Sequence, residues 1–338
     1  KKIMLFLIII LILLWFIWSY MNPGNKSKKV RPIVHSYEIP SPSSEVTQVI
    51  YRDKKPDTAA FSAFMLELAA NHQIEIEESS KKKKDFNVIL KDTNLVRDYS
   101  IFRVLFNTVG DGNQFTLSKL KKFGKKKKEG KGLFTAYSLW QQKVMEDADK
   151  IEYKDKRNIS LRKKALAWLI VTTLVTVTTL FLLANNFIVC GFLVILYAVF
   201  VFSCIHYYRS HAPYSEKGQA LKYQIMCFRG MLNDIGNFDM KKVGDLVLWE
   251  QILPYAVSLG LAKKVINALK INFATAELTT MGVYYPILLG GNWNFNDTMT
   301  TSMSSAITNY NSSVSGGSGG FSGGSSGGFG GGSGGGAF

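Results

Sequence analysis

Residues that hold metals or form disulfides are scarce in this sequence. It has three cysteines and four histidines among 338 residues, with no CxxC and no HExxH pattern. Zinc sites and disulfide frameworks need such spacings, so we expect neither. The P-loop pattern is also absent. We therefore find no candidate catalytic, cofactor-binding or metal-binding residues, and expect a protein that is not an enzyme and has no cofactor.

A long apolar run at the start of the chain has no charged residue and extends without a break from Ile3 to Trp18. A signal peptide has a shorter apolar core of about 7–15 residues and a small-residue cleavage site. Here the run ends in aromatic residues, including Trp15 and Tyr20, and the basic stretch KSKKVR follows. Such an aromatic belt is typical of the membrane interface. The sequence predicts a transmembrane helix over residues 1–20.

Charge is also missing from a second apolar block, the 41 residues from Ala165 to Ile205. One helix of that length would be roughly 60 Å long, about twice the hydrocarbon thickness of a bilayer. The block must therefore fold back, and ANN at 184–186 is the expected turn. The first arm is rich in threonine, whose hydroxyls can bond to helical carbonyls or to the neighbouring helix. We favour a packing role over an ion path, because neither arm has an ionisable Asp, Glu, Lys or Arg.

Basic residues flank the spans and predict their orientation. RNISLRKK precedes the hairpin, HYYRSH follows it, and the turn between its arms is uncharged. The positive-inside rule then places both remaining parts of the chain in the cytoplasm and the N-terminus outside. We expect a multi-pass protein of a bacterial cell membrane, with its C-terminus in the cytoplasm and a further part of the protein outside, before Lys1.

The first polar region is strongly basic, with 30 Lys and Arg against 18 Asp and Glu between Met21 and Lys164, a net charge of +12 (30 − 18). Its stretch TAAFSAFMLELAANHQ has a helical apolar pattern, and IEIEESSKKKKDFNVIL reads as two strands joined by a polar turn. A helix followed by a β-hairpin resembles the end of a winged-helix unit. We expect a winged-helix-like α+β domain with the hairpin turn as its wing tip.

Lysines in two expected loops are the candidate anion-contacting residues: Lys81, Lys82, Lys83, Lys84, Lys125, Lys126, Lys127 and Lys128. Clustered loop lysines act as point charges on phosphates and read no base sequence. The alternatives are a solvated surface, anionic lipid headgroups, and nucleic acid. Nucleic acid is the least expected, because the predicted helix at 57–73 has no Lys or Arg to contact base edges.

The second polar region contains several helical patterns and the apolar stretch LVLWEQILPYAVSLGLAKKV at 246–265. Its apolar part, Leu246 to Leu261, has only 16 residues, which is short for a transmembrane helix, and it contains Glu250 and Pro254. We expect Pro254 to break or kink the helix, and core packing rather than contact with a partner. Beyond it, residues 315–338 include 14 glycines and should be disordered, either as a free tail or as a peptide bound by a partner.

These patterns divide the chain into eight segments: a first transmembrane helix (1–20), a linker (21–56), the winged-helix-like domain (57–160), two further transmembrane helices (165–184 and 187–206), a small helical bundle (213–274), an irregular aromatic and polar segment (275–314) and a disordered Gly/Ser/Phe tail (315–338). The expected fold is thus a mainly α membrane protein, with a single span, a helical hairpin and two cytoplasmic modules.

A resemblance to a known family rests on the pattern W-x-x-x-L-P-Y-A-x-x-L-G, formed by Trp249, Leu253, Pro254, Tyr255, Ala256, Leu259 and Gly260. With YYPILLGGNWNF, FMLELAANHQIEIEE and the glycine-rich tail, it resembles the YciQ-like predicted bacterial membrane proteins (domain of unknown function 2207). The resemblance implies an extracellular domain before the first span and brings no established activity. ANHQ replaces the family's usual Arg-Gly turn, which weakens any role that depends on that arginine.

Our leading functional hypothesis is a non-enzymatic scaffold, adaptor or signal-transducing subunit in the membrane, with protein partners or a second copy of the chain. The alternative is a membrane-tethered, nucleic-acid-binding winged-helix regulator. No feature of the sequence gives positive support to an enzyme or a transporter subunit.

Overall fold

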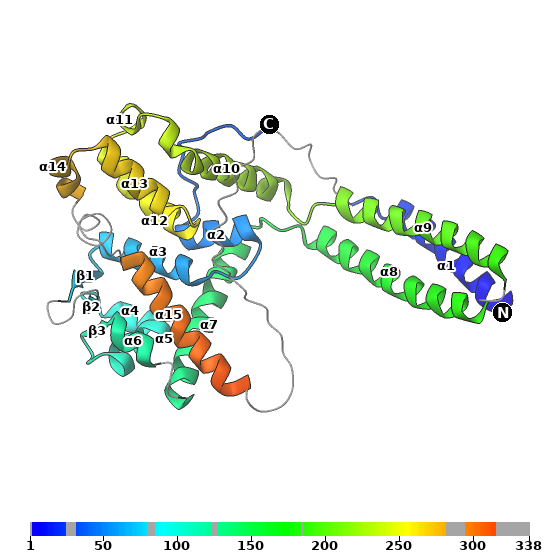
Figure 1. The fold of residues 1–338 in the computed structure, drawn as a ribbon, viewed down its shortest axis with the longest axis horizontal. Helices are drawn as coiled ribbons and strands as arrows, with labels where there is room; N and C mark the ends of the chain where they lie inside the picture. Colours follow the sequence, from blue (N-terminus) through cyan, green and yellow to red (C-terminus); the bar gives the residue numbers. More distant parts are fainter. Residues whose placement is uncertain are drawn as a thin grey trace.

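The computed structural model describes residues 2–24, 32–79, 85–123, 127–183, 186–281 and 295–315. Three long helices form a bundle that projects from a larger, mostly helical body (Figure 1). The predicted glycine-rich tail and the loop carrying Lys81–Lys84 lie outside the described residues. The mainly α architecture, with three apolar helices and a small sheet, is as predicted.

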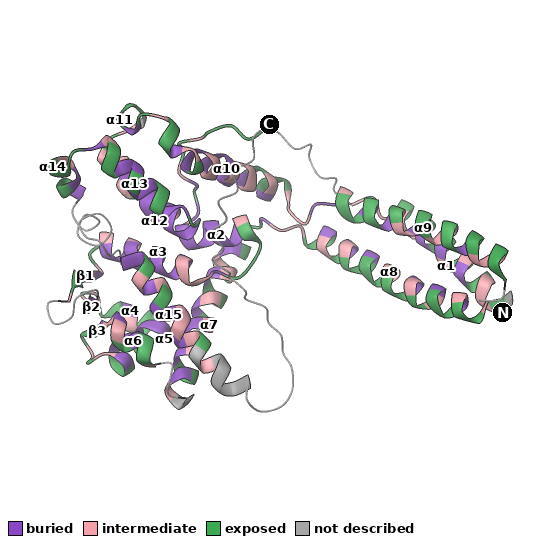
Figure 2. Ribbon diagram, in the orientation of Figure 1, coloured by how far each residue is buried: buried purple, intermediate pink, exposed green. Residues whose placement is uncertain are grey.

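The bundle consists of α1 (Lys2–Met21), α8 (Lys156–Leu182) and α9 (Phe187–Ser210), each long and apolar enough to cross a membrane. Most of their outward side chains are exposed (Figure 2), as expected where lipid covers them. Inside, Trp15 is fully buried and donates a hydrogen bond from Nε1 to Ser203 Oγ at 3.1 Å. The three predicted spans are therefore present as helices that pack together.

Three of the five threonines of α8 line the inside of this bundle. Thr172, Thr176 and Thr179 are buried. Thr176 Oγ1 donates back to the Thr172 carbonyl at 2.8 Å, while the Thr173 and Tyr197 hydroxyls share a hydrogen bond of 2.6 Å between α8 and α9. The small side chains allow close packing and satisfy most of their own hydroxyls, which agrees with the packing role.

The first half of the body contains a small antiparallel sheet surrounded by helices. The sheet has the order β1-β2-β3, and Ile76 of β1 pairs with Val88 of β2, as in the predicted hairpin. The elements are α2 (Ser44–Arg52), α3 (Thr58–Ala70), β1 (Ile74–Glu78), β2 (Phe86–Leu90), α4 (Asn94–Asp98), α5 (Ser100–Arg103), the π-helix η1 (Val104–Val109), β3 (Gln114–Thr116), α6 (Leu117–Phe123) and α7 (Lys127–Lys150).

The second half of the body follows the bundle and is helical in its described part. Its elements are α10 (Glu216–Asn233), the 3-10 helix η2 (Ile235–Asn237), α11 (Met240–Val243), α12 (Leu246–Ser258), α13 (Ala262–Asn272), α14 (Thr275–Leu278), the 3-10 helix η3 (Thr279–Met281) and α15 (Phe295–Ser315).

Both halves share one hydrophobic core, although the sequence indicated two separate modules. The fully buried Phe61, Phe102, Trp249 and Phe295 belong to the same cluster. α12 packs on α3, and α15 crosses α3, α6 and α7 (Figure 1). The chain thus leaves the body at the end of α7, passes through α8 and α9, and returns to complete the core it began.

α15 lies in the segment that we expected to be irregular. Phe295, Met299, Met303 and Ala306 are buried, at helical spacings of four, four and three residues. Serine, threonine and asparagine fill the intervening positions, and their low helix propensity obscured this narrow apolar stripe. Contact with α3, α6 and α7 supplies stability that the local sequence lacks.

α2 lies in the segment that we expected to be a linker. All seven residues from Ser44 to Ile50 are buried, because α2 packs against α3, α7, α10 and α12. Prolines before and after it, and polar residues within it, are typical of a linker. The surrounding helices bury those polar residues, a long-range effect that the local pattern does not contain.

α12 carries the family-like motif and continues through Pro254, so the expected break is wrong, while the alternative of a kink stays a prediction. A proline removes one helical hydrogen bond, and this loss is offset here by burial of Pro254 in α12, which packs against α2 and α3. The burial agrees with the expected packing role of this stretch and with its location outside the membrane.

Gly260 ends α12 with φ of +77°, in the left-handed region. The Gly260 N–H donates to the Val257 carbonyl at 3.1 Å, and the Leu261 N–H donates to the Ala256 carbonyl at 2.7 Å. These two bonds define a Schellman motif, which favours glycine because a side chain is strained at this φ.

Replacing Gly260 with alanine should lower the free energy of unfolding by about 1 kcal/mol, because the substituted residue must keep a left-handed conformation. Chemical denaturation of the detergent-solubilised chain, followed by circular dichroism, measures this change. Gly236→Ala is the control, since an added Cβ there meets no atom within 4 Å and its φ is not left-handed. Equal effects of the two substitutions would contradict the assigned role of Gly260.

Candidate functional site

An extended segment, residues 32–43, leads into α2 from the side of the first span; we call it the strap. It runs along α10 and is held there by side chains. The Tyr223 hydroxyl donates to the Pro32 carbonyl at 2.8 Å, and His35 Nε2 lies 3.0 Å from Asp234 Oδ2. The body therefore binds the strap through contacts spread along its length.

The end of the strap is held by Tyr255, the tyrosine of the motif on α12. Its hydroxyl donates to the Pro42 carbonyl at 2.9 Å and lies 3.4 Å from the Pro40 carbonyl. Thr47 Oγ1 of α2 donates to the same Pro42 carbonyl at 3.1 Å. The Tyr255 ring packs edge-on against Phe228 of α10, with ring centroids 6.0 Å apart. Tyr255 thus joins the strap to two helices of the second half.

Two carboxyl groups lie at the start of α2, immediately after the strap. Ser43 Oγ donates to Glu45 Oε1 at 2.9 Å, and the backbone N–H of Ser44 donates to Glu67 Oε1 of α3 at 3.3 Å. Ser44 Oγ also lies 3.5 Å from Glu45 Oε2. Ser44 therefore contacts both carboxyl groups, which places Glu45 and Glu67 on either side of one residue.

Burial controls the acidity of this pair. It raises the pKa of Glu45 to about 7, and the neighbouring Glu67 carboxylate adds to the shift, while the bonds from Ser43 and Ser44 oppose it. Burial also raises the pKa of Glu67. The pKa of Tyr255 rises to about 12, through burial and the two carboxylates nearby. Near neutral pH the site therefore exchanges a proton on Glu45 while Tyr255 stays a hydrogen-bond donor.

The middle of α2 is connected to its neighbours by Gln48, whose side chain is buried. Gln48 Nε2 donates to Asp57 Oδ1 at 2.8 Å and to the Ser258 carbonyl at 2.6 Å, and its Oε1 accepts from the Asp57 N–H at 2.9 Å. Asp57 in turn caps α3 and pairs with Arg52. One amide therefore links α2, the start of α3 and the end of α12.

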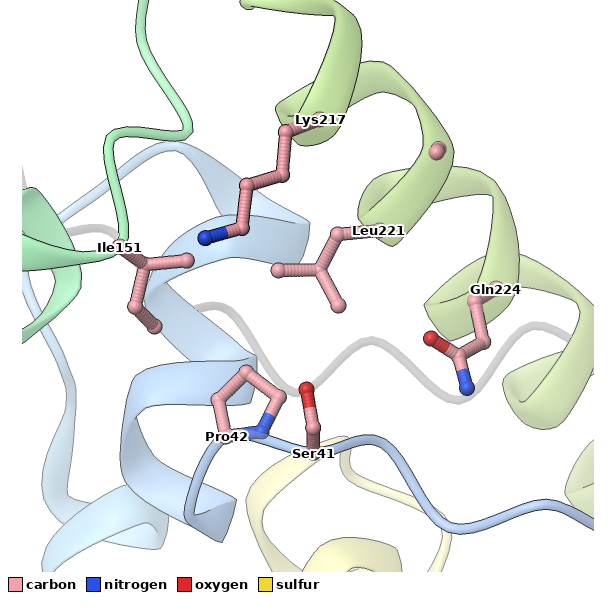
Figure 3. Close-up of a pocket in the computed structure, with 7 residues that line it drawn as sticks. Ser41, Pro42, Ile151, Lys217, Leu221 and Gln224 are labelled. Carbon is pink, nitrogen blue, oxygen red and sulfur yellow. The ribbon is translucent and has the colours of Figure 1, made fainter.

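A pocket of about 470 Å³ lies between the strap and α10. Figure 3 shows Lys217 and Gln224 reaching from α10 toward the strap, with the hydroxyl of Ser41 facing the same space. The pocket has apolar walls formed by Pro42, Ala220, Leu221 and Ile151. Its mixed lining can accommodate a small amphipathic group, and any such group would contact the strap directly.

The three spans are joined to one another where the bundle meets the body. The Tyr207 hydroxyl of α9 donates to the Asn22 carbonyl after α1 at 2.7 Å. A Cβ added at Gly24 would lie 2.6 Å from both Asn158 of α8 and the buried His211 ring. This close approach explains the glycine. His211 contacts the Tyr207 carbonyl, and the described residues contain no group of three His, Cys, Asp or Glu side chains able to hold a metal.

Most of the lysines predicted to contact anions lie outside the described residues. Lys81–Lys84, Lys125 and Lys126 lie outside the described residues, and Lys127 and Lys128 belong to the start of α7. The described ends of β1 and β2, which flank the first run, lie at the end of the body remote from the bundle (Figure 1). Their binding to lipid stays a prediction.

Sequence reasoning identified Tyr255 by its motif but missed Glu45 and Glu67. The sequence does contain an indication that Glu67 is unusual, because it is the one charged residue in the otherwise apolar stretch TAAFSAFMLELAA of α3. The sequence contains no such indication for Glu45, since a glutamate after two serines in a proline-rich stretch is typical of an exposed turn. Only contact with α3 and α12 makes these residues neighbours.

Replacing Tyr255 with phenylalanine should remove the bond to the Pro42 carbonyl and lower the free energy of unfolding by about 1 kcal/mol. Amide hydrogen exchange should rise in peptides covering the strap, as measured by mass spectrometry on the detergent-solubilised chain. Tyr37→Phe is the matched control, because the Tyr37 ring is exposed and packs on Phe238. Unchanged exchange of the strap in Tyr255→Phe would show that this tyrosine does not hold it.

Comparison with known proteins gives one family match. A family model described as "Predicted membrane protein (DUF2207) C-terminal domain" matches residues 32–269, from the first residue of the strap into α13. No curated protein and no solved structure matches the chain. The matched range covers well over half of the 338 residues and includes the strap, two of the spans and the motif of α12. The chain therefore belongs to the DUF2207 family of predicted membrane proteins.

Proposed function

We propose that this protein is a non-enzymatic adaptor or signal-transducing subunit, in which the spans and the body act as one connected unit. The observation that carries the proposal is the path from the membrane to the core. The residues after α1 pack at the junction with α8 and α9, and the strap then joins α2, on which four helices of the body pack. A displacement of the first span would therefore act on the centre of the body.

The body belongs in the cytoplasm under this proposal, with the N-terminus of α1 on the opposite side. All three spans meet the body at the same end of the bundle (Figure 1). Basic residues gather at that end, with Arg157, Lys163 and Lys164 exposed on the first turns of α8. Positive charge beside a span favours the cytoplasmic side and attracts anionic headgroups. Arg157, Lys163 and Lys164 are therefore candidates for contact with anionic headgroups.

Fusions to the C-terminus test this orientation. A fluorescent protein that matures only in the cytoplasm should be bright, and an alkaline phosphatase that is active only outside should be inactive. Replacing Arg157, Lys163 and Lys164 together with glutamine should raise the phosphatase signal, since the charges that retain this end inside are removed. A strong phosphatase signal from the unchanged chain would contradict the proposed orientation.

The nucleic-acid alternative has less support from the fold. The hairpin of β1 and β2 follows α3, as in a winged helix, and its two strands are joined in the sequence by a lysine run at 81–84. A recognition helix must present an exposed face to the groove. Nine of the 13 residues of α3 are buried, and both α12 and α15 pack on it. Using α3 for recognition would require removing two helices from the core.

Photo-crosslinking in native membranes tests the adaptor proposal. A photo-reactive amino acid at Ile271 of α13 or Leu139 of α7, both exposed on the body, should give reproducible adducts with a defined protein, identified by mass spectrometry. Ile195, exposed in the middle of α9, is the matched control and should react with lipid. Absence of protein adducts from both body positions would overturn the proposal, and recovery of nucleic acid instead would favour the alternative.

A further inference from the structure

The point where the strap enters the body contains two acidic side chains, Glu45 and Glu67, and neither forms an ion pair with a cation of the described residues. Glu45 is almost fully buried, and the charged neighbour that acts on it is Glu67. Both carboxyl groups contact Ser44, so they lie close to each other. Two negative charges at this spacing inside a protein repel each other strongly, whereas one charge and one neutral carboxyl group do not.

We propose that Glu45 and Glu67 form a proton-operated latch, which holds the strap on the body while the pair carries a proton and releases the strap and the first turn of α2 when that proton is lost. The latch needs no partner and does not depend on the adaptor function. It makes this site a binding site for a proton, at the entry of the strap into the core.

The groups that surround the pair agree with this role. From α12, the hydroxyl of Tyr255 is directed to the strap carbonyls, so it does not neutralise a carboxylate. From α10, Lys217 reaches toward Ser41 and Pro42 of the strap and makes no ion pair with Glu45 or Glu67 in the described part of the chain. Arg229, also of α10, stacks on Tyr51, almost two turns further along α2. Beyond α7, Lys154 pairs with Asp53, after the far end of α2. The described hydrogen-bond donors to the pair are therefore Ser43 and Ser44. These neutral donors stabilise one buried negative charge better than two.

Opening of the latch exposes Glu45 and Glu67 to water. These are the carboxyl groups that hold the proton in the closed form. Tyr255, Ser43 and Ser44 all act on the strap end or the first turn of α2. Moving that turn away lets water reach both carboxylates, while Gln48 holds the rest of α2 one turn later. Release is therefore local, and the core formed by α3, α12 and α15 stays in place.

The direction of the pH dependence follows from linkage. In the closed form Glu45 has a pKa of about 7, against 4.5 for an exposed glutamate, so the closed form binds the proton more tightly. The stabilisation of the closed form is complete below pH 4.5 and is lost as the pH rises to about 7. Opening should increase roughly tenfold or more between pH 5 and pH 7 and then level off.

Hydrogen exchange of the full chain in lipid nanodiscs tests the latch. Wild type and Glu45→Gln are compared at each pH from 5 to 8, so that the intrinsic pH dependence of amide exchange cancels. In peptides covering the strap and the start of α2, the ratio of wild-type to variant exchange should rise roughly tenfold or more up to pH 7. A ratio that stays constant across this range overturns the proposal.

Three controls separate the latch from other effects. Glu38→Gln, at an exposed position on the strap, should keep the wild-type pH dependence. Glu67→Gln should move the midpoint of the rise in exchange to lower pH, because removing a like charge lowers the pKa of Glu45. If Glu45→Gln does not fold, this shift is the measurement that tests the latch. An unchanged midpoint there, or an equal rise in exchange across α13, would exclude a local latch at this pair.

Discussion

The burial of α2 between four other helices is the constraint on which the rest of this structure depends. A nine-residue helix with serine, glutamate, threonine and glutamine on its surface is not stable alone. It exists because α3, α7, α10 and α12 surround it and because Gln48 finds partners for its whole amide. A buried amide without those partners would be costly, so the same bonds also specify how α3 and α12 sit beside α2.

This arrangement gives four residues of the predicted motif a physical role. Trp249 and Leu253 fill the shared core, and Gly260 ends the helix in a conformation that side chains avoid. Tyr255 lies at the edge of the core and binds the strap. The motif therefore combines packing, helix termination and attachment of the segment that comes from the membrane. Its location explains why an apolar stretch of this length lies outside the bundle.

The buried carboxyl groups lie where the strap enters the body. The strap has no regular secondary structure, and side-chain bonds to its carbonyl groups hold it in place. A site of low local stability is where a small change in charge has a large effect on opening. Placing Glu45 and Glu67 there costs stability at neutral pH but makes the join between spans and body responsive.

The sequence by itself determined the three spans, the β-hairpin and the motif, because these depend on local properties. Sixteen uncharged apolar residues, or alternating residues around a polar turn, favour one structure wherever they occur. Tertiary structure decided the rest. α2 and α15 have weak local patterns, and they are helices because distant elements cover them. The same long-range contacts merged two expected modules into one core, kept α12 intact at Pro254 and brought Glu45, Glu67 and Tyr255 together, since burial depends on which surfaces meet and not on neighbours in the chain.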